Sequence, residues 1–125
     1  MVMKLMLILL GGGLGSVCRF LFTHWAERWF GNGFTWGTLG VNLCGCFLIG
    51  LLFAFVEKDL IPQAARLCLI TGFLGGLTTF STYALESIDY ISRKEHFWFF
   101  FNLVVQNVGG LGLVIIGRWV GRVLG

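Results

Sequence analysis

Four long apolar stretches restrict the folds that this chain can adopt. They run from Leu5 to Phe22, Trp29 to Val56, Leu67 to Leu85 and Phe97 to Gly117, and the only charge within the first is Arg19. A helix needs about 20 residues to cross the hydrocarbon core of a bilayer, and each stretch is long enough to do so. The chain is therefore predicted to be an all-α membrane protein with four transmembrane helices in a single domain.

The composition agrees with this class. Of the 125 residues, 57% are hydrophobic and 12% are charged, and the mean hydropathy of +0.86 lies well above the soluble average. The predicted spans cover about residues 4–24, 36–57, 64–91 and 96–121, because Trp29 to Trp36 combines Gly31, Asn32 and Gly33 with aromatic residues and is interpreted as an interfacial loop. The net charge of +3 is too small and too scattered to indicate a nucleic-acid partner.

The basic residues encode the orientation of the chain only weakly. Four spans put both termini on one side of the membrane, and the cations predicted on that side are Lys4, Lys58, Arg66, Arg118 and Arg122. The other side holds Arg28, Arg93 and Lys94, and also Arg19 if its side chain reaches the interface. A chain with so small a bias can insert in both orientations. Two opposite copies could then form an antiparallel two-fold dimer, which would bury polar faces that four helices hardly enclose.

The third span contains a segment that is unlike a uniform transmembrane helix. Its sequence is TGFLGGLTTFSTYALE, from Thr71 to Glu86, in which three glycines are followed by a cluster of hydroxyl side chains. Low helix propensity and polar groups together predict a break near residues 75–80. Because unpaired backbone groups cost several kcal/mol in hydrocarbon, such a break must be buried in protein or line a watery path. The break is the first candidate for a functional site.

Two charged residues lie within or beside the apolar spans. Arg19 either extends to the interface or pairs inside the protein. Glu86 lies in the last turns of a helix that is predicted to resume around Phe80, where an acid opposes the helix dipole, so it needs a partner. Arg19 is a candidate partner on grounds of depth alone.

Small residues in the first span predict close packing with another helix. Gly11 and Gly15 form a GxxxG pair, and a packing role is favoured over a ligand role. The four cysteines lack the C-x-x-C spacing of metal or redox sites and are interpreted as small apolar fillers. Neither His24 nor His96 has a second ligand at useful spacing.

Carboxamides occur at membrane depth in two spans. In the second span Asn42 shares a helical face with Thr38, and it either links helices by a hydrogen bond or offers its N–H donors to an anion in a pore. In the fourth span Asn102, Gln106 and Gly110 recur every four residues, with Asn107 beside them. This stripe is predicted to line a path or to join the two copies of a dimer.

These residues favour permeation over catalysis. Five of the six carboxylates fall at helix ends or in loops, and no phosphate-binding motif is present. A proton-coupled exporter would normally carry a carboxylate deep in a span, and the first span has none. The remaining polar groups are neutral donors and the ring edges of Phe80 and Tyr83, a set that suits a small, strongly hydrogen-bonding anion. A small exporter of another class and a purely structural dimeric subunit remain as alternatives.

Three motifs resemble the signature of the Fluc, or CrcB, family of fluoride channels. They are GGxxGxxxR from Gly11 to Arg19, GTLxVNxxG from Gly37 to Gly45, and GFLGGLTTFST from Gly72 to Thr82. They cover three of the four spans in the family's order and spacing. The resemblance implies a passive channel, not an enzyme, that exports fluoride from the cytoplasm across the inner (plasma) membrane. It also implies an antiparallel dual-topology homodimer with two pores and a structural sodium ion where the two broken third helices cross.

The resemblance also assigns roles to individual residues. The sodium ligands would be the backbone carbonyls of Gly75 and Thr78 from both subunits. The fluoride pore would be formed by Asn42, Phe80, Tyr83, Ser81 and Thr82, continued by Thr38, Asn102 and Gln106. Arg19 and Glu86 match charged positions of the family. The chain departs from the usual pattern at Tyr83, where the family has a second phenylalanine, and at Gly110, where a serine is common.

Overall fold

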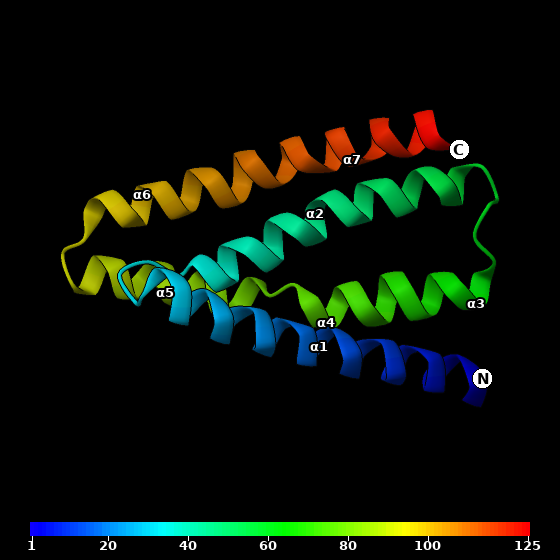
Figure 1. The fold of residues 1–125 in the computed structure, drawn as a ribbon, viewed down its shortest axis with the longest axis horizontal. Coiled ribbons are helices and arrows are strands. Elements are labelled where there is room, and N and C mark those ends of the chain that lie inside the picture. Colours follow the sequence, from blue (N-terminus) through cyan, green and yellow to red (C-terminus); the bar gives the residue numbers. More distant parts are fainter.

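The computed structural model describes residues 1–125 as four helical spans, each of which runs in the direction opposite to the span before it (Figure 1). The first two spans are single helices, α1 (Val2–Phe30) and α2 (Trp36–Glu57). The third consists of α3 (Gln63–Arg66), a π-helical stretch η1 (Leu67–Leu74), α4 (Gly75–Leu77) and α5 (Phe80–Ser92). The fourth consists of α6 (His96–Val104), a π-helical stretch η2 (Val105–Gly109) and α7 (Gly110–Leu124). No strand is present.

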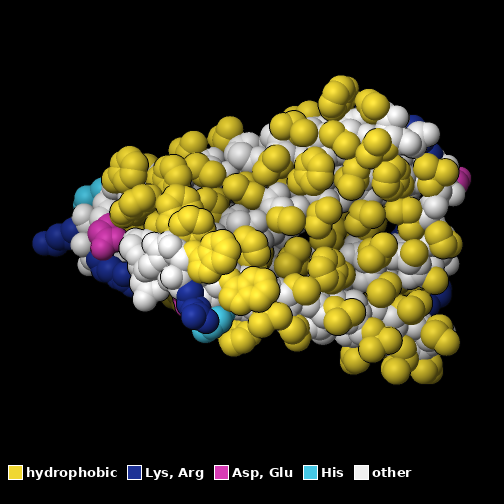
Figure 2. Space-filling model, in the orientation of Figure 1, with side chains coloured by type: hydrophobic (Ala, Val, Ile, Leu, Met, Phe, Trp, Pro, Cys, Tyr) yellow, Lys and Arg dark blue, Asp and Glu magenta, His cyan; other side chains and the backbone are white.

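All four spans are long and apolar enough to cross a membrane. Hydrophobic side chains cover the middle of the face seen in Figure 2, and charged side chains gather at its two ends. The two termini lie at the same end of the molecule (Figure 1). The chain is therefore a multi-pass membrane protein.

Helix α1 is longer than the first predicted span. It continues beyond residue 24 to Phe30, because the sequence from 25 to 30 contains neither glycine nor proline. It ends at Gly31, which has a φ of 74° and whose N–H donates to the carbonyl of Glu27 at 2.9 Å. The loop is therefore shorter than the predicted Trp29 to Trp36, because Trp29 is helical. Helix α2 begins at Trp36, where the second span was predicted to begin.

Glycines bring α1 into backbone contact with the first half of the third span. A Cβ atom on Gly15 would overlap the carbonyl oxygen of Phe73, and one on Gly76 would overlap that of Gly12. Only glycine allows helices to approach this closely. The predicted packing role of Gly11 and Gly15 is confirmed.

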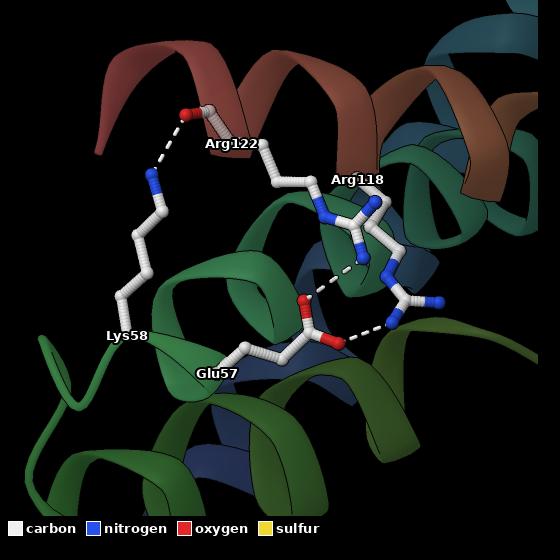
Figure 3. Close-up of polar contacts among 4 residues, drawn as sticks. All are labelled: Glu57, Lys58, Arg118 and Arg122. Atoms are coloured by element: carbon white, nitrogen blue, oxygen red, sulfur yellow. Dashed lines mark hydrogen bonds and ion pairs between the residues drawn. The ribbon is translucent and has the colours of Figure 1, made fainter.

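Helices α2 and α7 are joined by a second glycine contact and by an ion-pair cluster. A Cβ atom on Gly117 would overlap the carbonyl oxygen of Phe47. At the ends of the same helices Glu57 binds both Arg118 and Arg122, while the Lys58 ammonium donates to the carbonyl of Arg122 at 2.7 Å (Figure 3). These contacts fix α2 against the fourth span.

An aromatic cluster closes the opposite end of the bundle. Phe34 is buried and its ring packs against those of Trp36, Tyr90, Trp98 and Phe101. The Tyr90 hydroxyl also accepts the backbone N–H that precedes α2, at 2.9 Å. The second and fourth spans are thereby held together at both ends, the third span joins them at the aromatic end, and the polar groups lie between.

Candidate functional site

The backbone of the third span leaves the helical conformation at Thr78 and Thr79. Helix α4 ends at Leu77, Thr78 has φ −87° and ψ 152°, Thr79 has φ −147° and ψ 113°, and α5 begins at Phe80. This extended link is visible between α4 and α5 in Figure 1. Backbone N–H and C=O groups therefore need partners from outside the helix in the middle of a membrane span.

Asn42 satisfies both backbone groups of Thr79. The Thr79 N–H donates to Asn42 Oδ1 at 2.8 Å, and Asn42 Nδ2 donates to the Thr79 carbonyl at 3.0 Å. Asn42 Nδ2 also donates to Gln106 Oε1 at 3.1 Å. Both amide hydrogens of Asn42 are thus engaged within the protein. The sequence left two roles open for Asn42, a link between helices and a donor to an anion. In the structure its hydrogen bonds link helices.

Thr79 also caps the helix that follows it. Its hydroxyl accepts the backbone N–H of Thr82 at 3.2 Å and donates to the Thr82 hydroxyl at 3.0 Å. In a continuous α-helix the N–H groups of Thr79 and Thr82 would donate to the carbonyls of Gly75 and Thr78. Here both N–H groups donate to side chains instead. The two carbonyls are therefore released from the helical pattern.

The polar stripe of the fourth span faces protein rather than lipid. Gln106 Nε2 donates to Asn102 Oδ1 at 3.4 Å, and Asn102 Nδ2 donates to the Ser87 hydroxyl at 3.0 Å. The Ser87 hydroxyl donates in turn to the carbonyl of Tyr83 at 2.8 Å. Asn102 is 0% exposed, so its amide depends wholly on these partners. A continuous chain of hydrogen bonds thus connects the break to α5 through α6.

A cleft of about 420 Å³ lies beside the break. The predicted residues that line it are Asn42, Gly75, Thr78, Phe80, Tyr83 and Gln106. The Phe80 side chain is 77% exposed and the Tyr83 side chain only 7%, and their ring centroids are 5.5 Å apart. Ser81 and Thr82 are exposed and do not line this cleft.

Thr38 and Glu86 lie in a second, smaller pocket of about 120 Å³ at the closed end of the bundle. The Thr38 hydroxyl donates to Glu86 Oε1 at 2.7 Å, and Glu86 Oε2 is buried with no partner. Arg19 makes no ion pair with Glu86, so the predicted pairing is wrong. Depth alone does not bring two side chains together, because the rotation of each helix decides which way they point.

The structure adds Asn107 to the cleft. Its Nδ2 donates to the Tyr83 hydroxyl at 3.0 Å and to the carbonyl of Leu103 at 2.8 Å. The sequence placed this residue beside the polar stripe but gave it no role. In a regular α-helix consecutive side chains point about 100° apart. In the π-helical η2, where the helical period is changed, the consecutive residues Gln106 and Asn107 both line the cleft. In the sequence, the only sign of this role was that Asn107 directly follows Gln106.

Comparison with known proteins identifies the family. The model of the CrcB-like protein family, Camphor Resistance (CrcB), matches residues 6–118. A fluoride-specific ion channel of Hydrogenobaculum sp. (strain Y04AAS1) is 40% identical over 98% of this chain and 100% of its own length. One of Aquifex aeolicus (strain VF5) is 43% identical over 94% of this chain and 95% of its own length. These relatives are ion channels and not enzymes. The chain therefore belongs to the CrcB-like family, together with relatives that are named fluoride-specific ion channels.

Proposed function

We propose that this protein is a passive, fluoride-selective channel that lowers cytoplasmic fluoride. The observation that carries the proposal is the cleft beside Thr78 and Thr79, where neutral hydrogen-bond donors and aromatic rings surround an interrupted membrane span. The relatives' shared name supports fluoride as the permeating ion.

The chemistry of the cleft fits a small anion that must shed its water. Gln106 keeps one amide hydrogen without a protein acceptor, and the edges of the Phe80 and Tyr83 rings carry partial positive charge. Helix α5 starts at Phe80, so its first N–H groups and positive dipole end are directed at the same region. Neutral groups of this kind replace hydration without holding the ion as tightly as a buried cation would, which conduction requires.

Asn42 supports this path from the side. Its two amide hydrogens bind Thr79 and Gln106. Asn42 therefore stabilises the extended backbone link at Thr79 and orients the Gln106 amide. Asn102 continues that support, because it binds the Gln106 amide from the opposite side. Thr38 lies with Glu86 in the smaller pocket, and Ser81 and Thr82 lie on the exposed side of the break; these residues are proposed to serve the entrances of the pore.

The active form in this proposal is an antiparallel dual-topology homodimer with two pores. Phe80 and Gly75 line the cleft and are both exposed in a single chain, so a second copy would cover them. Five basic residues at the end that carries the termini, against three at the other, also leave the orientation in the inner membrane poorly specified.

A structural sodium ion at the centre of the dimer fits the released carbonyls. The carbonyls of Gly75 and Thr78 lose their helical donors to Asn42 and to the Thr79 hydroxyl. Two chains would offer four such oxygens, and a hard cation is bound by oxygen ligands. The sodium ion would hold the two third spans together and supply no chemistry to the permeating anion.

Fluoride enters cells as neutral hydrogen fluoride and dissociates in a less acidic cytoplasm, where the anion is trapped. A passive channel gives that anion an exit. Purified protein in fluoride-loaded liposomes, followed with a fluoride electrode and a pH-sensitive dye, tests the mechanism. We expect fluoride release that leaves an imposed proton gradient in place, whereas coupled loss of the gradient would indicate an exporter of another class.

A further inference from the structure

The Tyr83 hydroxyl is a donor that the protein leaves unused. Its oxygen accepts the Asn107 Nδ2 hydrogen at 3.0 Å, and no acceptor in the chain lies within reach of its own hydrogen. The side chain is 7% exposed and lines the 420 Å³ cleft beside Phe80 and Gln106. A nearly buried hydroxyl with an unused hydrogen is expected to find a partner.

Asn107 can only act as a donor toward this hydroxyl. Its Nδ2 also donates to the carbonyl of Leu103 at 2.8 Å, and a carbonyl can only accept. The atom shared by both contacts must therefore be the amide nitrogen, with both of its hydrogens engaged. Because the Tyr83 oxygen accepts a hydrogen bond from Asn107, the phenolic hydrogen points away from Asn107.

We propose that Asn107 is a positioning residue that directs the Tyr83 hydroxyl hydrogen into the cleft, where it donates to the permeating anion. This inference rests on the proposed function and makes it more specific. The tyrosine hydroxyl is an uncharged group that can both donate and accept a hydrogen bond. It thus adds a strong donor without adding a charge. The donor favours the anion that accepts hydrogen bonds most strongly, which is the smallest halide.

A double-mutant cycle tests the link between the two residues. Fluoride efflux from liposomes is measured for the natural chain, Tyr83→Phe, Asn107→Leu and the double variant. We expect each single change to lower the efflux rate about fivefold, which corresponds to the loss of one neutral hydrogen bond to the permeating ion. The double variant should be no slower than Tyr83→Phe, because both changes remove the same donor. Val108→Leu is the matched control, since Val108 follows Asn107, is 67% exposed and does not line the cleft.

Tyrosine labelled with carbon-13 at Cζ gives a readout that loss of packing would not move. The chain has two tyrosines, and Tyr83→Phe identifies which signal belongs to Tyr83. In the natural chain fluoride should shift the Tyr83 signal in a saturable way, and chloride should not. In Asn107→Leu the same shift should require at least fivefold more fluoride.

Two results would overturn the inference while leaving the channel function standing. One is a conducting natural chain whose Tyr83 signal does not respond to fluoride. The other is a fall in efflux on Asn107→Leu that is equally large in the Tyr83→Phe background. Failure of the proposed function looks different, because the natural chain itself would then release no fluoride.

Discussion

The carboxamide of Asn42 replaces the helical partners of Thr79 on both sides of its peptide unit. It accepts the Thr79 N–H at 2.8 Å and donates to the Thr79 carbonyl at 3.0 Å. One side chain from α2 therefore stabilises an extended backbone link inside the third span. Without it, two backbone groups would be left unpaired at membrane depth, at a cost of several kcal/mol each in hydrocarbon.

Asn42→Asp changes both the hydrogen bonds of this residue and the charge of the cleft. The carboxylate retains an acceptor for the Thr79 N–H, but it loses the donors to the Thr79 carbonyl and to Gln106. It also adds negative charge to the wall of the cleft. We expect fluoride efflux to fall to background, while the variant elutes from size-exclusion chromatography at the same volume as the natural chain, as the proposed dimer would. Unchanged efflux would remove Asn42 from the anion path.

Asn102→Leu tests the buried amide chain. The substitution leaves the Gln106 amide and the Ser87 hydroxyl short of a partner in a site that is wholly buried. We expect a loss of about 1–3 kcal/mol in the free energy of unfolding, measured in detergent. Val104→Leu, at an exposed position of the same helix, is the control and should unfold like the natural chain. Equal stability of the two variants would mean that the amide chain is dispensable.

Gly15→Ala tests the close contact between α1 and the third span. The added methyl group would overlap the Phe73 carbonyl oxygen, and backbone cannot move aside as a flexible side chain can. We expect a loss of about 1–3 kcal/mol in the free energy of unfolding. A Cβ atom on Gly13 meets nothing within 4 Å, so Gly13→Ala should be neutral or slightly stabilising. Two variants of equal stability would contradict the packing described for α1.

Removal of sodium tests the proposed role of the Gly75 and Thr78 carbonyls. If a sodium ion joins two chains, then exchange of sodium for N-methylglucamine during purification should lower the melting temperature and favour monomers, because a ligand that binds only the assembled state stabilises it. Return of sodium should restore both properties. A dimer with the same melting temperature in either salt would argue against a bound ion.

The sequence specified the helices well because their signals are local. Apolar runs of sufficient length located the four spans, and the Gly11 and Gly15 spacing located a close helix contact. The sequence also predicted a break near residues 75–80, and the extended residues of the structure are Thr78 and Thr79.

Partnerships between helices could not be predicted in the same way. The sequence suggested Arg19 as the partner of Glu86, whereas the structure pairs Glu86 with Thr38, four residues before Asn42 on the same helix. It also gave no role to Asn107, which reaches Tyr83 from the π-helical turn η2. Such contacts depend on helix rotation and on local changes in helical period, and neither is encoded by the spacing of residues within one span.

Selectivity for fluoride is measured as the release of fluoride and chloride from the same liposomes, which are loaded with both anions and reconstituted with the natural chain. A potassium ionophore balances the charge, and ion-selective electrodes follow the two anions together. We expect rapid fluoride release, with chloride retained until detergent is added. Release of both anions at similar rates, or of neither, would contradict the proposed function.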